Sequence, residues 1–194
     1  MTCRFRDVGK GGAVETILSG AGYFIWPLGA CSLLSVFLIV ERALALRTDR
    51  VIPPEVFAAA LRGDAVAAAS GDSAATRLVS CWRSGATGET LKSFARAEVV
   101  RLQRGLHLLD SVVAAAPLLG LLGTVAGLAA LFPAQGVPDQ ATLTRGVGLA
   151  LSTTMIGLFI AIPSLVASNW LHRRLEVLSS RLEVLVESLL AARR

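Results

Sequence analysis

Three long runs without a charged residue constrain this chain more than any other feature of its sequence. They cover residues 21–40, 111–138 and 146–171. A helix needs roughly 20 apolar residues to cross a hydrocarbon core of about 30 Å, so each run is long enough to span a membrane. Buried helices of a soluble bundle are the alternative, but these normally carry a polar stripe, and here only scattered Ser and Thr interrupt the runs. We therefore predict an all-α, polytopic membrane protein with three transmembrane helices.

The composition agrees with membrane spans and argues against a disulfide framework or a metal site. Of the 194 residues, 54% are hydrophobic and 17% are charged, whereas a soluble domain has about 45–50% apolar and about 25% charged residues. Cys3, Cys31 and Cys81 form an odd set without metal-ligand spacing. We expect no metal and no cofactor, and we expect Cys31 to be a small packing residue.

Basic residues are divided unevenly between the two sides of the predicted membrane. With three spans, residues 41–110 and 172–194 lie on the same side, and they hold fifteen of the nineteen Lys and Arg residues. The positive-inside rule places this side in the cytoplasm and the N-terminus outside. Anionic lipid explains the clustered Arg residues, and no basic patch interleaved with aromatic residues indicates nucleic acid.

Seven segments follow from the runs and the charges. They are an extracytoplasmic N-terminal segment (1–20), a first transmembrane helix (21–43), a cytoplasmic helical segment (44–107), a second transmembrane helix (108–132), a short extracytoplasmic turn (133–143), a third transmembrane helix (144–171) and a cytoplasmic tail (172–194). Within the cytoplasmic segment, Pro54-Glu55 and the apolar residues after them predict a short amphipathic helix. A longer helix is expected to start near Gly88 and to run straight into the second span.

The tail contains a heptad pattern. Arg-Leu-Glu-Val-Leu at 174–178 recurs at 181–185, and the leucine positions step by three and four residues, as in a coiled-coil seam. An amphipathic helix lying on the bilayer is the alternative, but Glu176, Glu183 and Glu187 oppose an anionic surface. We favour helix–helix packing, with the third span continuing into the tail.

Small residues and hydroxyls recur on faces of the second and third spans. Small residues four positions apart let helix backbones approach closely in lipid, and Pro117 and Pro163 each free a carbonyl and permit a kink. The hydroxyls either bond to their own helix carbonyls or face a wet, protein-lined path, and spacing does not decide between these alternatives. The packing candidates are Gly120, Gly123, Gly127, Gly157 and Ala161, and the candidate path residues are Thr124, Ser152, Thr153 and Thr154.

No Asp, Glu, Lys, Arg or His lies inside the three runs. Asp110 and Arg145 stand only at their edges, and His107 and His172 are expected to be solvated at the membrane boundaries. Proton carriers within a membrane normally need a titratable group, so a carboxylate would have to come from another chain. No constellation of residues indicates catalysis, and we predict that the chain is not an enzyme.

Two motifs in consecutive spans resemble the MotA/TolQ/ExbB family of proton-channel subunits. Residues 116–127 are similar to the family's AP-x-x-GL-x-GTV-x-G, and residues 150–163 to its AL-x-x-T-x-x-GL-x-x-AIP. Asn169 and Arg173 match the N-x-x-x-R that follows. Trp26-Pro27 and the exit Glu41-Arg42 fit the ExbB-like first span, and three spans favour ExbB or TolQ over the four-span MotA type.

The resemblance implies a pentameric ring in the bacterial inner membrane, whose pore is lined by the second and third spans and by Thr124 and Thr154. It also implies two copies of an ExbD/TolR-like single-span partner that supplies an intramembrane Asp, and a TonB/TolA-like protein that receives the work. Leu149 is a departure, because many ExbB and TolQ members have Glu at this position. A non-conducting oligomeric scaffold is therefore the alternative function.

Overall fold

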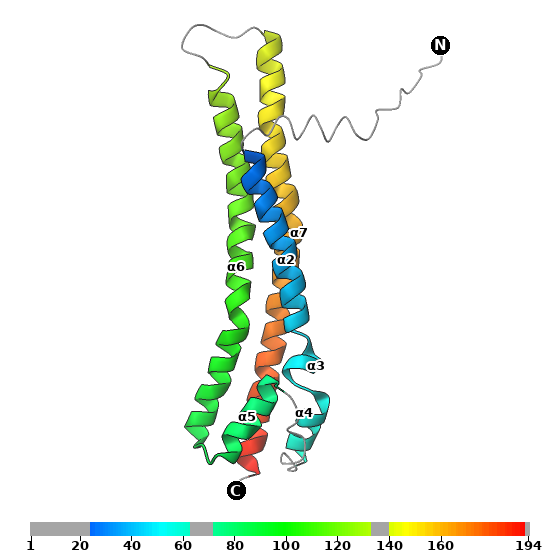
Figure 1. The fold of residues 1–194 in the computed structure, drawn as a ribbon, viewed down its shortest axis with the longest axis vertical. Helices are drawn as coiled ribbons and strands as arrows, with labels where there is room; N and C mark the ends of the chain where they lie inside the picture. The colour runs from blue at the N-terminus through cyan, green and yellow to red at the C-terminus, as the bar shows by residue number, and fades with distance from the viewer. Residues whose placement is uncertain (1–23, 63–71, 133–139, 193–194) are drawn as a thin grey trace, which may run out of the picture. The chain divides into compact units, whose positions relative to one another are not determined.

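The computed structural model describes residues 24–62, 72–132 and 140–192, and every regular element in these ranges is a helix (Figure 1). The predicted N-terminal segment 1–20 lies outside the described residues, as does most of the predicted turn. The helices are α2 (Ile25–Ala45), α3 (Thr48–Val51), α4 (Pro54–Leu61), α5 (Ala74–Arg83), α6 (Gly88–Ala129) and α7 (Gln140–Ala191).

Within the described residues, three helices are long and apolar enough to cross a membrane. These are α2, α6 and the part of α7 from Gly146 to Ala191. The predicted all-α class with three spans is thereby confirmed. With 42 and 52 residues, α6 and α7 are much longer than a span requires. Both helices are unbroken at Pro117 and Pro163. Because α6 begins at Gly88 and α7 ends at Ala191, the second and third spans are confirmed to continue as helices beyond the apolar runs.

The chain divides into two compact units. Unit 1 comprises Met1–Val36 and Ser111–Leu165, and unit 2 comprises Phe37–Asp110 and Val166–Arg194. Since α2, α6 and α7 each cross from one range to the other, each contributes one part to each unit.

The interior of unit 1 is formed mostly by small residues and hydroxyls, with Leu28 and Val112 as buried exceptions, and many large apolar residues lie outside. Ala116, Ala150 and Thr153 are buried, whereas Trp26 is 78% exposed and Phe159 is 81% exposed. A protein in water buries its large apolar side chains, because removing their surface from water is favourable. The inverted arrangement is typical of helices surrounded by lipid, where small residues allow close packing.

Unit 2 has the opposite arrangement, with a core of large aliphatic side chains. The tail packs in this core through five leucines that are each at most 4% exposed. The tail therefore packs against other helices of its own chain and does not turn its leucines outward. These leucines are Leu175, Leu178, Leu182, Leu185 and Leu189.

Short helices complete the core of unit 2, and their ends follow from local sequence. Pro54 occupies the first position of α4, where its fixed φ suits a helix start; this helix confirms the amphipathic helix predicted there, with Val56 and Ala60 buried. Ser73 caps α5 by accepting a hydrogen bond from the Thr76 backbone N–H at 3.1 Å. Gly85, with φ of 85°, allows the chain to turn after α5 toward α6.

Candidate functional site

In unit 1, the backbones of α6 and α7 approach each other at two glycines. A Cβ atom added to Gly120 would lie 2.9 Å from the carbonyl oxygen of Thr153, and one added to Gly157 would lie 2.6 Å from that of Ala116. Because real Cβ atoms essentially never come this close to other heavy atoms, only glycine fits at both positions. This contact brings together two of the five residues that the sequence suggests for helix packing.

The other three candidate packing residues also lie on inward faces of unit 1. A Cβ at Gly123 would lie 2.9 Å from the Thr153 hydroxyl oxygen, and one at Gly127 would lie 3.1 Å from the Ala150 Cβ. Ala161 is 6% exposed. Later positions of α6 thus contact earlier positions of α7, so the two helices are antiparallel within this unit.

Three of the four candidate path hydroxyls donate to carbonyls of their own helix. Thr124 Oγ1 donates to Leu121 O at 2.6 Å, and Ser152 Oγ donates to Leu149 O at 2.6 Å. Thr153 Oγ1 is directed at Ala150 O at 2.7 Å and also at Gly120 O on α6 at 3.1 Å. These hydroxyls satisfy their hydrogen bonds within the protein, and Thr153 also links the two helices.

Thr154 differs from the other three, because its buried hydroxyl has no hydrogen-bond partner. Two further buried side-chain atoms in the described ranges lack a partner, Arg42 Nε and Trp82 Nε1, and both belong to unit 2. Buried polar groups are nearly always hydrogen-bonded, so each exception calls for an explanation. Thr154 is therefore the one of these four hydroxyls whose hydrogen bond the described residues leave unsatisfied.

A serine pair joins α2 to α7 inside unit 1. The oxygens of Ser35 and Ser164 lie 2.5 Å apart, and Ser164 donates its own proton to Ile160 O at 2.7 Å, so Ser35 is the donor to Ser164. Sequence reasoning missed this pair. The only signal was a serine within each apolar run, and spacing cannot match positions 129 residues apart.

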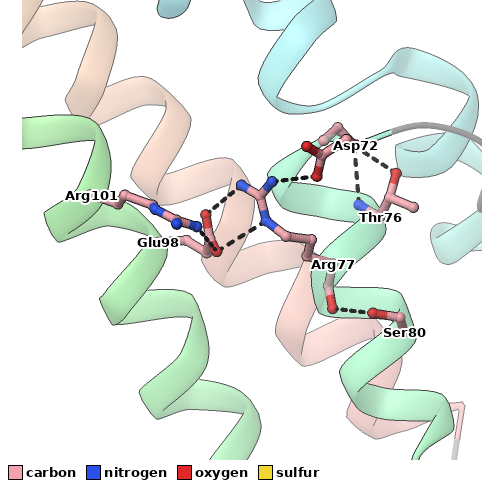
Figure 2. Close-up of polar contacts among 7 residues, drawn as sticks. Asp72, Thr76, Arg77, Ser80, Glu98 and Arg101 are labelled. Atoms are coloured by element: carbon pink, nitrogen blue, oxygen red, sulfur yellow. Dashed lines mark hydrogen bonds and ion pairs between the residues drawn. The ribbon is translucent and has the colours of Figure 1, made fainter.

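Unit 2 carries an ion-pair network between α5 and α6 (Figure 2). The Arg77 guanidinium donates to both oxygens of Glu98, at 3.1 and 2.8 Å, and its third nitrogen donates to Asp72 at 2.6 Å. Arg101 approaches Glu98 at 3.7 Å from the same helix. The hydrogen bond to Glu98 is the largest cause that raises the pKa of Arg77, so this side chain stays protonated. The network attaches a short helix to a long one.

No group of three His, Cys, Asp or Glu side chains in the described part of the chain is placed to hold a metal ion. The described residues bring together Asp110 and His172, which the sequence places only at membrane boundaries. The side-chain arrangement therefore offers hydroxyls within unit 1 and titratable groups within unit 2.

Comparison with known proteins identifies relatives of this chain. Residues 55–184 match the model of the MotA/TolQ/ExbB proton channel family. The biopolymer transport protein ExbB of Helicobacter pylori strain J99 is 40% identical over 87 residues, which cover 43% of this chain and 60% of that protein. The ExbB of Aquifex aeolicus is 37% identical over 89 residues, covering 44% of this chain and 60% of that protein.

A putative ExbB homolog of Methanothermobacter thermautotrophicus is 35% identical over 89 residues, covering 45% of this chain and 32% of that protein. The matched part of each of these relatives is thus less than two thirds of its length. The family model, in contrast, matches more than half of this chain and includes both glycine-rich spans. The chain belongs to the MotA/TolQ/ExbB proton channel family.

Proposed function

We propose that this chain is the proton-channel subunit of an ExbB/TolQ-type motor in the bacterial inner membrane. It uses the proton motive force, together with an ExbD/TolR-like partner, to energise outer-membrane transport or another envelope process through a TonB/TolA-like protein. Family membership supports the proposal, as do relatives that are named biopolymer transport proteins. The proposal assigns the chain no catalytic reaction.

The interior of unit 1 is the observation that carries this proposal. It presents hydroxyls, among them the unpartnered Thr154, but the runs 111–138 and 146–171 contain no titratable side chain. Hydroxyls can order water but do not titrate near neutral pH, and proton carriers within a membrane normally do. A partner that inserts an Asp beside Thr154 would complete the path.

Assembly into a ring, a pentamer by family resemblance, is part of the proposal. Large apolar side chains cover the outside of unit 1, and some of them would face neighbouring copies in place of lipid. In unit 2, α6 and α7 border a groove of about 530 Å³ with an apolar floor that includes Val99, Leu182 and Val186. A stable monomer, found by mass measurement in mild detergent, would contradict the ring.

The proposed orientation places unit 2 in the cytoplasm and rests on the fifteen basic residues in 41–110 and 172–194. The exposed Ser93 of α6 offers a direct check. In a variant without the native cysteines, Ser93→Cys should be protected from an impermeant thiol reagent in intact cells and should react after the inner membrane is opened. Reaction in intact cells would reverse the orientation.

Replacement of Thr154 by Val separates a conducting role from a packing role. Thr154→Val keeps the shape of the side chain and removes the unpartnered hydroxyl, so it should leave assembly intact and lower proton flux through the complex with its partner. Thr144→Val is the matched control, since Thr144 is exposed on the same helix and donates to Gln140 O at 2.8 Å.

Flux is measured with a pH-sensitive dye in liposomes. Equal flux in the two variants and the unchanged protein would show that the Thr154 hydroxyl has no role in conduction and that Thr154 acts only in helix packing. Absence of flux from the unchanged complex would favour the non-conducting scaffold, for which Leu149 in place of the family's usual Glu is the supporting observation.

A further inference from the structure

Asp110, Ser168 and His172 form a hydrogen-bonded group between α6 and α7, which we call the boundary cluster. All three residues belong to unit 2. Ser168 Oγ donates to Asp110 Oδ1 at 2.6 Å, and His172 Nε2 lies 3.5 Å from Asp110 Oδ2. Ser168 is buried, whereas the side chains of His172 and Asp110 are 41% and 42% exposed. The cluster thus combines a fixed carboxylate with an imidazole that water can reach.

The hydrogen bonds assign the tautomer of His172. Its Nδ1 lies 3.0 Å from the backbone carbonyl oxygen of Ser168. A carbonyl only accepts, so Nδ1 carries the hydrogen in the neutral ring, and Nε2, which lies 3.5 Å from Asp110 Oδ2, then has the free lone pair. One proton can therefore be shared between Asp110 Oδ2 and His172 Nε2. Groups that transfer protons often lie slightly beyond hydrogen-bond distance in a resting structure.

The position of the cluster relative to the uncharged runs gives it a role. The run of the second span begins at residue 111, directly after Asp110, and the run of the third span ends at residue 171, directly before His172. These two residues are thus the first titratable groups on α6 and α7 at this end of the spans. Any proton that moves along these helices toward unit 2 reaches this pair before any other titratable side chain of either helix.

We propose that Asp110 and His172 form a proton-transfer site, positioned by Ser168, that accepts protons from the second and third spans and releases them to water on the side of unit 2. A proton arrives on Asp110 Oδ2, moves to His172 Nε2, and leaves from the exposed imidazolium to water. One proton enters and one leaves, and both groups return to their starting states. The site rests on the proposed function, because it handles protons that the channel delivers.

Other charged groups nearby are engaged elsewhere or lie further from the spans. The Arg42 side chain occupies the space beside Gly105 and pairs with Glu41 at 3.0 Å, and Arg174 lies 4.2 Å above the Trp170 ring. Asp110 and His172 are, in contrast, paired with each other. The charged or titratable groups closest to the cluster along α6 and α7 are Arg104, His107, Arg173 and Arg174, and those toward the end of α2 are Glu41 and Arg42.

NMR of the chain alone tests the pairing without any conduction. The ring signals of His172, recorded at one pH, should shift in Asp110→Asn, because the carboxylate lies 3.5 Å from Nε2 of the ring. The same signals should be unaltered by His107→Gln, a replacement of the other histidine of the chain. Ring signals of His172 that do not respond to Asp110→Asn would overturn the proposal.

Proton flux tests the role of the pair in the complex with an ExbD/TolR-like partner from the same genome. His172→Gln and Asp110→Asn should each lower flux several-fold and change its pH profile, and His107→Gln should leave both unchanged. A membrane-impermeant imidazole compound such as carnosine should restore flux to His172→Gln, because the site is accessible from water. A role in packing alone would not be rescued in this way.

The outcomes separate this site from the proposed function. If the unchanged complex conducts, and both variants conduct with its rate and pH profile, the transfer site is wrong and the channel remains. If the NMR signals of His172 respond to Asp110→Asn but the unchanged complex passes no protons, the proposed function is wrong. Loss of flux without rescue by carnosine would assign Asp110 and His172 to packing and overturn the transfer site.

Discussion

At the scale of single residues, Gly120 and Gly157 set the distance between two spans. Each takes a position where a methyl group would meet a backbone carbonyl of the facing helix, at 2.9 and 2.6 Å. Backbone cannot move aside as a flexible side chain can. The absence of a side chain is therefore what allows α6 and α7 to come together in unit 1.

Gly120→Ala and Gly157→Ala should each destabilise unit 1 by about 1–3 kcal/mol, as overpacking does in other cores. Gly148→Ala is the matched control on α7, because nothing lies within 4 Å of a Cβ at Gly148. Gly148→Ala should leave the free energy of unfolding unchanged or raise it by up to about 1 kcal/mol, since Ala favours a helix over Gly. Thermal unfolding in mild detergent measures both effects. Equal stability of Gly120→Ala and Gly148→Ala would show that the spans do not depend on this contact.

The hydrogen-bond partners of the four candidate path hydroxyls could not be predicted from the sequence. Spacing left open whether Thr124, Ser152, Thr153 and Thr154 bond to their own helices or face a path. In the structure, only Thr154 lacks a partner. The other three donate to a carbonyl three residues earlier in their own helix, which depends on the side-chain rotamer, and spacing does not determine the rotamer.

At the scale of helices, the network around Glu98 attaches α5 to α6. Glu98 is buried, with a side chain 6% exposed, and Arg77 supplies two hydrogen bonds to it. A buried carboxylate is costly unless it is paired. Arg77 thus compensates a charge that would otherwise oppose folding of this part of unit 2.

Arg77→Met should destabilise unit 2 by about 1–3 kcal/mol, because it leaves the Glu98 carboxylate without its hydrogen-bond donors. Asp72→Asn is the control, since Asp72 is 89% exposed and such pairs contribute at most about 1 kcal/mol. Hydrogen exchange of the amides in α5 should rise in Arg77→Met and stay unchanged in Asp72→Asn. The double change Arg77→Met with Glu98→Met should recover part of the loss.

Folding raises the pKa of Arg77, so its charge stabilises the folded state. This stabilisation is complete below the pKa that Arg has in the unfolded chain, and it is lost only as the pH rises through the higher pKa of the folded state. Its charge therefore does not make the network weaker near neutral pH. Fast exchange of α5 in the unchanged protein would contradict the role of the network.

Long helices were predictable from the sequence, and contacts between helices were not. The uncharged runs and the heptad tail predicted helices that pass beyond the spans, as α6 and α7 do. The partners Arg77 and Glu98 are 21 residues apart on different helices, and the prediction of a solvated His172 left out its pairing with Asp110. Such pairs depend on the register between helices, which the periodicity of one helix does not determine.

At the scale of the whole chain, two kinds of interior occur in one polypeptide. Unit 2 encloses large aliphatic side chains, as a protein in water does. Unit 1 encloses mostly small and hydroxyl side chains and exposes many large apolar ones. The change occurs along α2, α6 and α7 near Phe37, Asp110 and Val166. This distribution is typical of a chain with one part in a membrane and one part in water.

The decisive measurement is proton flux into liposomes that contain this chain alone or together with a single-span partner that has an intramembrane Asp. The runs 111–138 and 146–171 contain no titratable group, and proton carriers within a membrane normally need one. The chain alone should therefore assemble and pass few protons. Addition of the partner should start conduction, and Asp→Asn in the partner should abolish it. Strong proton flux from this chain alone would contradict the two-component channel.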